Sequence, residues 1–134
     1  MRIHRKPVVA ALALVLLNGA ASLGGHQQSE TPTRVVHIVA ERFTFTPSRI
    51  TVDEGTTVEL RITSDDTAHG FKLTGPGSID VEIPKRGRGD RRVVFTATEV
   101  GSYTFECSRV CGAGHGFMRG TLQVKTRGPQ GARP

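Results

Sequence analysis

Apolar residues in this chain of 134 residues fall in short runs, and turn-forming residues separate the runs. In the run 57–63 every second side chain is apolar, and charged side chains lie between them. A period of two is that of a β-strand with one face in a core and the other in water. No long segment has the 3.6-residue period of an amphipathic helix, so the pattern predicts an all-β fold.

The pattern predicts eight strands, which suit a sandwich of two sheets. They are 34–40, 49–52, 57–63, 70–73, 81–83, 92–96, 101–107 and 119–125. Turns are expected between them where Pro, Gly and Asp gather, as at 53–55, 75–77 and 84–90. Periodicity alone does not distinguish an immunoglobulin-like sandwich from other two-sheet folds.

The beginning of the chain has the layout of a secretory signal peptide, with a basic start, an apolar stretch at 8–17 and the small residue Ala21 at the expected cut. The apolar stretch is short for a membrane span, because in a helix it covers about 15 Å against about 30 Å of hydrocarbon. We therefore expect cleavage after Ala21, with an uncleaved anchor as the alternative. The expected organisation is a signal peptide at 1–21, a flexible linker at 22–33, one folded domain at 34–126 and a flexible tail at 127–134.

The expected leader also bears on location and charge. Export would place the domain on the outer side of the cytoplasmic membrane, in the periplasm, and an uncleaved leader would attach it to that membrane. The formal net charge is +6, but Arg2, Arg5 and Lys6 of the leader account for three of the 18 cationic residues, and the leader has none of the 12 acidic ones. The mature chain is therefore only mildly basic. Because export separates it from nucleic acid, nucleic acid is not expected as a partner.

Soft ligands are concentrated in the twelve residues from Cys107 to Met118. Thiolate, thioether and imidazole groups suit copper, whereas magnesium or calcium would require carboxylates and carbonyls. Cys111, His115 and Met118, with a second histidine from elsewhere in the chain, would complete a mononuclear blue-copper site. Cys107 is one thiol more than such a site requires. Two thiolates side by side can bridge two copper ions, so the spacing favours a binuclear centre.

The spacing CxxxCxxxHxxM, with His69 upstream, resembles the CuA motif of subunit II of haem-copper cytochrome oxidases and of the C-terminal domain of nitrous oxide reductase. The resemblance runs from about residue 35 to residue 124. It implies a cupredoxin-like Greek-key β-sandwich or barrel, a cofactor of two copper ions at one end of it, and electron transfer as the function. In the implied ligand set, Cys107 and Cys111 bridge both ions, His69 and His115 bind one ion each, and Met118 and the backbone carbonyl of Arg109 are weak ligands.

Two features depart from the oxidase form of this motif. Oxidases usually have Glu at the position of Arg109, where its carboxylate also holds a magnesium ion against the large subunit, and a cationic side chain cannot do so. The chain also contains no Trp, so it has no Trp equivalent in the surface through which oxidases accept electrons from cytochrome c. Both features separate this chain from an ordinary oxidase subunit.

Simpler interpretations exist for some of these residues. Two cysteines four positions apart in an exported protein often form a disulfide, but a disulfide would explain none of His69, His115 and Met118. Met118 alone would be interpreted as a core residue. His37 alternates with apolar neighbours in a predicted strand, so we expect it on the surface face rather than at a metal.

Three functions fit the ligand set. The first is an electron-transfer protein, the second is a copper chaperone or carrier with a looser loop, and the third is an accessory component, similar to subunit II, of a terminal oxidase or reductase. In each case the chain alone is expected to be a carrier rather than a catalyst. The basic run 85–92 suggests docking to an acidic redox partner or to anionic lipid heads, and its alternative interpretation is a solvated hairpin loop.

Overall fold

The computed structural model of the chain describes residues 33–128, which form nine strands and one short 3₁₀ helix. The elements are β1 (Thr33–Glu41), β2 (Thr44–Thr46), β3 (Arg49–Asp53), β4 (Thr57–Ser64), β5 (His69–Leu73), β6 (Ile79–Ile83), β7 (Arg91–Thr96), β8 (Gly101–Glu106), η1 (His115–Phe117) and β9 (Arg119–Lys125). Eight strands match the prediction with ends within two residues of those expected, so the all-β prediction is confirmed. The expected signal peptide, and most of the expected linker and tail, lie outside the described residues.

The sequence pattern does not predict β2, because its three residues are too few to display a period of two. Within β2, Phe45 is buried and lies opposite Ala40 of β1 in the antiparallel register. The turn between these two strands consists of Arg42 and Phe43, and both of these residues contact the candidate metal centre described below.

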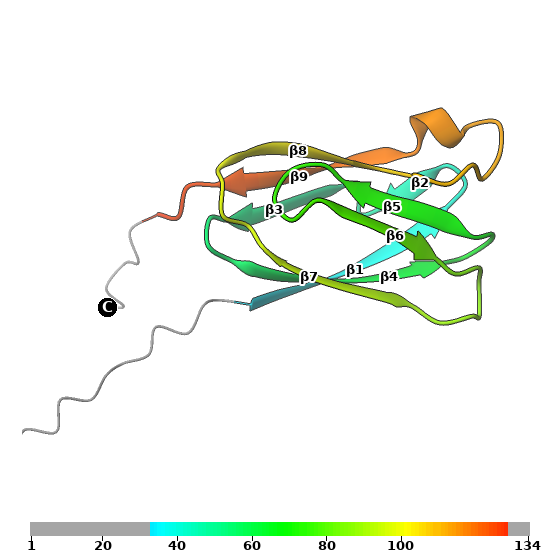
Figure 1. The fold of residues 1–134 in the computed structure, drawn as a ribbon, viewed down its shortest axis with the longest axis horizontal. Helices are drawn as coiled ribbons and strands as arrows, with labels where there is room; N and C mark the ends of the chain where they lie inside the picture. Colours follow the sequence, from blue (N-terminus) through cyan, green and yellow to red (C-terminus); the bar gives the residue numbers. More distant parts are fainter. Residues whose placement is uncertain (1–32, 129–134) are drawn as a thin grey trace, which may run out of the picture.

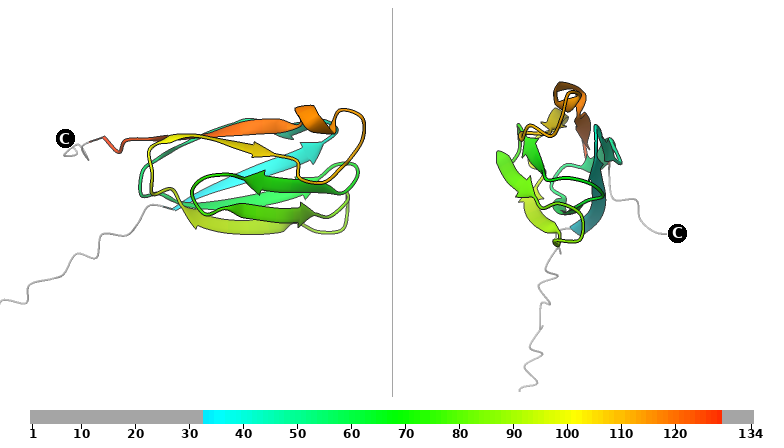
Figure 2. Two further views of the ribbon diagram at one scale, coloured as in Figure 1. Left: turned by 45° about the horizontal axis from the view of Figure 1, so that its top comes forward. Right: turned by 90° about the vertical axis from the view of Figure 1, so that its right-hand side faces the viewer.

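The strands form two sheets that face each other (Figures 1 and 2). One sheet has the order β2-β1-β4-β7 and the other has the order β3-β9-β8-β5-β6. Each sheet contains one parallel pair, β1 with β4 and β3 with β9, and all other neighbours are antiparallel. Parallel neighbours require a crossover connection, so the chain passes from one sheet to the other repeatedly. Residues far apart in the sequence are thereby brought to the same end of the sandwich.

Three phenylalanine rings form the centre of the core between the sheets. Phe71 and Phe105 stack with their ring centroids 5.2 Å apart, and Phe45 meets both rings edge-on at 5.8 and 5.5 Å. All three side chains are buried, and full burial of such a ring contributes about 1.5–3 kcal/mol. Phe71 belongs to the strand that begins with His69, and Phe105 lies two residues before Cys107. The core therefore fixes the two strands that carry the first candidate ligands.

Four connections lie at one end of the sandwich, on the right in Figure 1. They are the β1–β2 turn at 42–43, the β4–β5 loop at 65–68, the β6–β7 loop at 84–90 and the ligand loop at 107–118. We refer to these four connections together as the metal end. The first and last described residues lie at the opposite end of the molecule. Within residues 33–128 no helix has the length and apolar character that a membrane crossing requires.

Candidate metal centre

The two cysteines of the ligand loop lie side by side at the end of β8. The Sγ atoms of Cys107 and Cys111 are 3.8 Å apart, and both residues are buried. A disulfide bond would bring the sulfurs to about 2.05 Å. Both thiols are free in this structure, so the alternative of a disulfide is not the arrangement that the fold adopts here.

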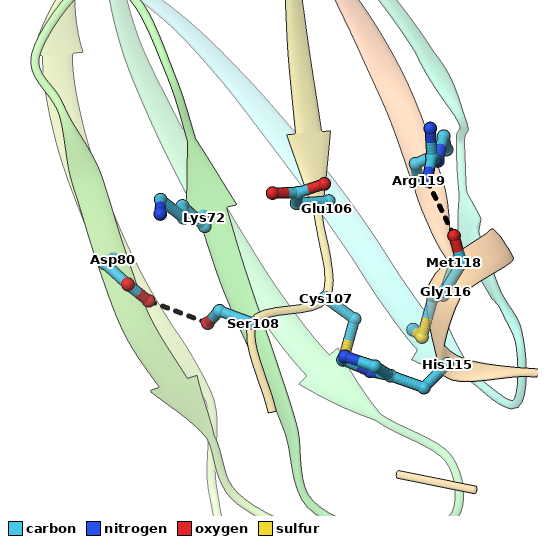
Figure 3. A pocket seen from close by; sticks show the side chains of 9 residues that line it. All are labelled: Lys72, Asp80, Glu106, Cys107, Ser108, His115, Gly116, Met118 and Arg119. Atoms are coloured by element: carbon cyan, nitrogen blue, oxygen red, sulfur yellow. Dashed lines mark hydrogen bonds between the residues drawn. The ribbon is translucent and has the colours of Figure 1, made fainter. Parts of the chain in front are cut away.

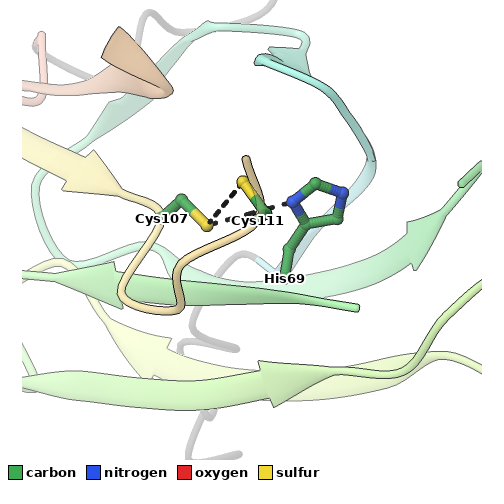
Figure 4. Close-up of side chains that lie close together, drawn as sticks. All are labelled: His69, Cys107 and Cys111. Carbon is green, nitrogen blue, oxygen red and sulfur yellow. Dashed lines mark hydrogen bonds between the residues drawn. The ribbon is translucent and has the colours of Figure 1, made fainter. Parts of the chain in front are cut away.

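Each cysteine sulfur has one histidine nitrogen beside it. The Nδ1 atom of His69 lies 3.9 Å from the Sγ of Cys107, and the Nδ1 atom of His115 lies 3.9 Å from the Sγ of Cys111. His69 is the first residue of β5 and is completely buried, whereas His115 opens η1 and is partly exposed. Figure 4 shows the His69 ring directed at the two sulfurs from a different segment of the chain.

The two remaining candidates also lie at the sulfurs. The Met118 Sδ is 3.9 Å from the Cys111 Sγ, and the carbonyl oxygen of Arg109 is 3.1 Å from the Cys107 Sγ. The side chain of Arg109 points elsewhere and forms an ion pair with Glu82. The fold thus brings all six predicted site residues together, and their roles as metal ligands stay a prediction. His37, which we expected on a surface face, is exposed in β1.

The sulfur geometry agrees with shared metal ligation. Thiolate sulfur lies about 2.3 Å from zinc in tetrahedral protein sites, which places two sulfurs of one ion about 3.8 Å apart. The two cysteine sulfurs have this separation, and the ligand atoms of His69, Cys107 and Cys111 all lie within 4.8 Å of one another. Sulfur and imidazole donors without a carboxylate among them suit copper, so the residues present fit that metal.

Asp66 orients the first histidine. Its carboxylate accepts a hydrogen bond of 2.7 Å from Nε2 of His69 and one of 3.1 Å from the backbone N–H of Arg42. Burial acts to raise the pKa of Asp66, but the hydrogen bonds from His69, Arg42 and Thr67 outweigh burial and hold this pKa below its ordinary value. Because the carboxylate engages Nε2, Nδ1 of His69 is left to face the sulfurs.

The β1–β2 turn holds the ligand loop from the other side. The Arg42 guanidinium donates a hydrogen bond of 2.9 Å to the carbonyl oxygen of Cys111. The Phe43 ring packs against the loop so closely that a side chain at Gly114 would overlap it, and a Cβ at Gly112 would lie 3.0 Å from it. Gly112 has a φ of +143°, so it needs glycine for its conformation as well. Gly114 has a φ of −91°, which any residue can adopt, so glycine is required there only because the Phe43 ring lies so close.

Sequence reasoning missed Asp66, Arg42 and Phe43. A signal for Asp66 was present, because an acidic residue three positions before a candidate ligand histidine can reach the far ring nitrogen. Arg42 and Phe43 gave no such signal, since they are 69 or more positions away from the loop residues that they contact. Only the pairing of β1 with β2 places their turn at the metal end.

Burial affects the protonation of the cysteines. Removal from water, together with the neighbouring Cys107 thiol, raises the pKa of the Cys111 thiol to about 11. Without metal this thiol is therefore protonated at neutral pH. Metal binds thiolate rather than thiol, so binding has to release protons from the site.

A polar pocket opens beside the centre. It has a volume of about 340 Å³, and Cys107, His115 and Met118 form part of its wall. The remaining wall is largely charged, with Lys72, Asp80, Glu106 and Arg119 around Ser108, whose hydroxyl donates to Asp80 (Figure 3). Solvent therefore approaches the centre from this side, while His69 on the other side is sealed from it.

Residues 8–124 match the sequence profile of a family described as a cupredoxin-like domain. The chain belongs to the cupredoxin family. The two facing sheets and the metal end agree with this membership, so the prediction of a cupredoxin-like β-sandwich is confirmed.

Many known proteins resemble this cupredoxin, and three of them illustrate the range. Cytochrome c oxidase subunit 2 of Thermus thermophilus is 36% identical over 91 residues, which make up 67% of this chain and 64% of that protein. The periplasmic domain of subunit II of cytochrome oxidase (CoxB) of Bradyrhizobium japonicum superposes with a TM-score of 0.61 at 18% identity, covering 69% of this chain and 83% of that one. Auracyanin A, a blue copper protein of Chloroflexus aurantiacus, gives a TM-score of 0.56 at 23% identity, with 69% and 99% covered.

The cupredoxin is homologous to the copper domain of cytochrome c oxidase subunit II, as the motif resemblance implies, and it spans less than two thirds of the Thermus protein. Family membership implies a copper-binding electron-transfer domain. The number of copper ions does not follow from the fold, because an oxidase subunit and a blue copper protein share it. That number depends on the residues of the ligand loop.

Proposed function

We propose that this chain is an electron-transfer protein with a binuclear, CuA-type copper centre. The observation that carries the proposal is the pair of cysteine sulfurs 3.8 Å apart, each with its own histidine nitrogen at 3.9 Å. A mononuclear blue-copper site would use one thiolate and would leave the second buried thiol without a purpose. Cys107, Cys111, His69 and His115 would hold the copper, which would supply one-electron redox chemistry when bound.

The surrounding residues support electron transfer better than copper delivery. Asp66 fixes the orientation of His69, and Arg42 holds the backbone of Cys111. The backbone N–H of Cys107 also donates to the carbonyl of Met118 at 2.9 Å, which closes the base of the ligand loop. A delivery protein needs ligands that move apart easily. Here every candidate ligand side chain except that of His115 is buried, and His69 and the ligand loop are fixed from several directions.

A second candidate is a role as the copper-bearing component of a terminal oxidase or reductase, similar to subunit II. The relationship to the Thermus oxidase subunit favours it. Against it stands Arg109, whose side chain is engaged with Glu82 where oxidases usually carry a magnesium-binding carboxylate. We therefore place electron transfer with a separate redox partner first.

The test of the binuclear centre is a copper count per chain combined with the optical and EPR spectra of the loaded protein. We expect two coppers per chain and the hyperfine pattern of one electron shared by two copper nuclei. One copper per chain with the pattern of a single nucleus would exclude the binuclear proposal. Rapid loss of copper to a competing chelator would favour delivery over electron transfer.

We also propose that the chain is exported and that its domain lies in the periplasm. The support is the basic and apolar layout that precedes Ala21, together with the periplasmic location of the related CoxB domain. N-terminal sequencing of the exported protein should begin just after Ala21. A sequence that begins at Met1 would instead indicate the uncleaved membrane anchor.

A further inference from the structure

The most exposed large apolar side chains of the described residues lie in the ligand loop. Phe117 is 84% exposed and Val110 is 81% exposed, whereas Val35, Val94 and Val100, the other exposed large apolar residues, reach only 47–50%. Val110 is directly before Cys111, and Phe117 lies between His115 and Met118. Both side chains flank candidate ligands and are almost fully open to contact with another molecule.

The metal end is also cationic. Its four connections carry five cationic side chains, Arg42, Lys85, Arg86, Arg88 and Arg109, against the three acidic side chains Asp65, Asp66 and Asp90, which leaves a net charge of +2. The three connections of the opposite end, at 54–56, 74–78 and 97–100, contain Glu54 and Glu99 and no cationic residue. The connections of the two ends therefore differ in the sign of their charge, while the strand ends and the segment that adjoin the opposite end add Arg34, Lys125 and Arg127 there.

Three of the cations at the metal end have no acidic partner. Arg42 pairs with Asp66, and Arg109 pairs with Glu82. None of the ion pairs formed within residues 33–128 involves Lys85, Arg86 or Arg88, and all three side chains are exposed. Their charge is therefore available to a partner.

The loop that carries these three cations is attached to the metal centre. The backbone N–H of Arg86 donates to the carbonyl oxygen of Asp66 at 3.2 Å, and the Asp66 side chain holds His69. The Lys85 carbonyl accepts from the backbone N–H of Arg88 at 3.0 Å, which folds the loop into a turn. Around Gly87 and Gly89 the space is open, so the turn stands out from the sandwich.

We propose that the metal end is a docking surface for an acidic redox protein, with Phe117 and Val110 against an apolar spot of the partner and Lys85, Arg86 and Arg88 facing its carboxylates. A standard interface of about 800 Å² per partner is a disc about 30 Å across, enough to cover the end of a small domain. This inference rests on the proposed function, because an electron carrier needs a partner at its metal centre. It adds the sign of that partner's charge.

A protein fits this surface better than a lipid membrane does. A uniformly anionic lipid surface favours cations without interruption, whereas Asp65 and Asp90 are exposed among the cations of the metal end. Apolar side chains of the ligand loop at one edge of the metal end and a mixed, mainly cationic loop at the other edge suit a protein surface, which presents apolar and acidic groups at separate places (Figures 1 and 2). Exposed charges of this kind act over about 10 Å at 0.1 M salt, so the docking depends on ionic strength.

The test uses two forms of one probe protein that differ in the sign of their net charge. Unmodified cytochrome c is basic, and cytochrome c with succinylated lysines is acidic and has the same fold. Both the probe and the copper-loaded chain are kept reduced, so no electron passes and the result depends on docking alone. Amide NMR shifts of the chain are followed during titration at low and at moderate salt. We expect the acidic probe to shift amides of the metal end, more weakly at higher salt, and the basic probe to leave them unchanged.

Matched variants locate the contact. Arg86→Ser with Arg88→Ser should weaken binding of the acidic probe roughly twofold to thirtyfold, the range for two exposed ion pairs. Arg34→Ser with Lys125→Ser removes the same charge at the opposite end of the molecule, where β1 begins and β9 ends, and should have no effect. Phe117→Ser should weaken binding, and Val100→Ser at the opposite end should not.

Several outcomes would overturn the proposal: stronger binding of the basic probe, shifts away from the metal end, or equal effects of the two charge-removing variants. Binding to vesicles of anionic phospholipid without binding to the acidic protein would assign the surface to a membrane instead. Docking as expected without electron exchange between oxidised chain and reduced probe would uphold the docking surface and count against the proposed function alone.

Discussion

The two cysteines of the centre have different neighbours. Cys111 lies beside His115 and Met118, which with one more histidine make a complete mononuclear copper set. Cys107 lies beside His69 and the Arg109 carbonyl, and it also accepts the backbone N–H of Gly70 at 3.5 Å. Removal of the Cys107 sulfur therefore leaves a complete set of candidate ligands for one copper, whereas removal of the Cys111 sulfur does not.

Replacing Cys107 by Ser should reduce the copper content from two ions to one and remove the signature of a shared electron, because Cys111, His115, Met118 and His69 remain as a mononuclear set. Replacing Cys111 by Ser should lower copper binding further, since it disrupts that set as well as the bridge. Copper content and EPR spectra of both variants, beside the unmutated protein, are the measurement. A Cys107→Ser protein that retains two coppers and the unmutated spectrum would show that Cys107 does not bridge.

Asp66 would act on bound copper through its hydrogen bond to His69, so its removal tests how much the orientation of that histidine matters. Asp66→Asn should lower copper affinity about 10- to 100-fold, the usual cost of losing a partner behind a ligand histidine. The matched control is Asp65→Asn, which removes the same charge from an exposed neighbour. Affinity is measured by competition with a chelator. Equal losses in both variants would mean that net charge, rather than the bond to His69, is responsible.

At the level of elements, the strands and the ligand loop could be predicted, because a local periodicity or a local spacing of residues encodes them. Alternation revealed β4, and the spacing of Cys107, Cys111, His115 and Met118 revealed the ligand loop. The contacts of Arg42 and Phe43 could not be predicted, because they depend on a three-residue strand and on the packing of a turn against a loop distant in sequence. The sequence therefore predicted the candidate ligands but not the contacts of Arg42 and Phe43 that hold the ligand loop in place.

The outer face of one sheet carries a charge cluster that does not involve the metal end. Arg61 of β4 lies directly opposite Arg92 of β7, a like-charge pair that would repel. Glu59 offsets this repulsion, since its two carboxylate oxygens accept hydrogen bonds of 2.7 Å from Arg61 and 2.8 Å from Arg92. The hydrogen bonds from Arg92 and Arg61 lower the pKa of Glu59 from 4.5 to about 2.

This pKa shift makes part of the stability depend on pH. Because the pKa of Glu59 is lower in the folded than in the unfolded chain, its contribution is complete above pH 4.5 and is lost as the pH falls from 4.5 towards 2. The metal-free protein should therefore be more stable than its Glu59→Gln variant at pH 7, and the difference should shrink across this acidic range. Thermal unfolding of both proteins at several pH values measures it. A difference that stays constant down to pH 2.5 would contradict the role of the carboxylate.

At the scale of the whole molecule, the centre joins segments that the sequence keeps apart. His69 is 38 positions from Cys107, and the two meet because β5 and β8 are neighbours in one sheet. The other sheet contributes Arg42 from the end of β1. A metal bound to the predicted ligands would hold both strands and the ligand loop in the folded arrangement. In the unfolded chain His69 and the loop residues are not held together, so the metal favours the folded state.

Copper removal should therefore lower the melting temperature of the entire domain. At a free copper level one hundred times the dissociation constant, binding contributes about 2.7 kcal/mol to stability. For a domain of this size that corresponds to a drop of roughly 10–20 °C when a chelator removes the metal. Differential scanning calorimetry of the loaded protein, with and without chelator, is the measurement. The control is the double variant Cys107→Ser and Cys111→Ser, whose melting temperature should not respond to the chelator because it has lost both sulfurs. An equal response of the double variant would mean that the chelator acts elsewhere on the chain, and no response of the unmutated protein would mean that copper does not bridge the two strands and the loop.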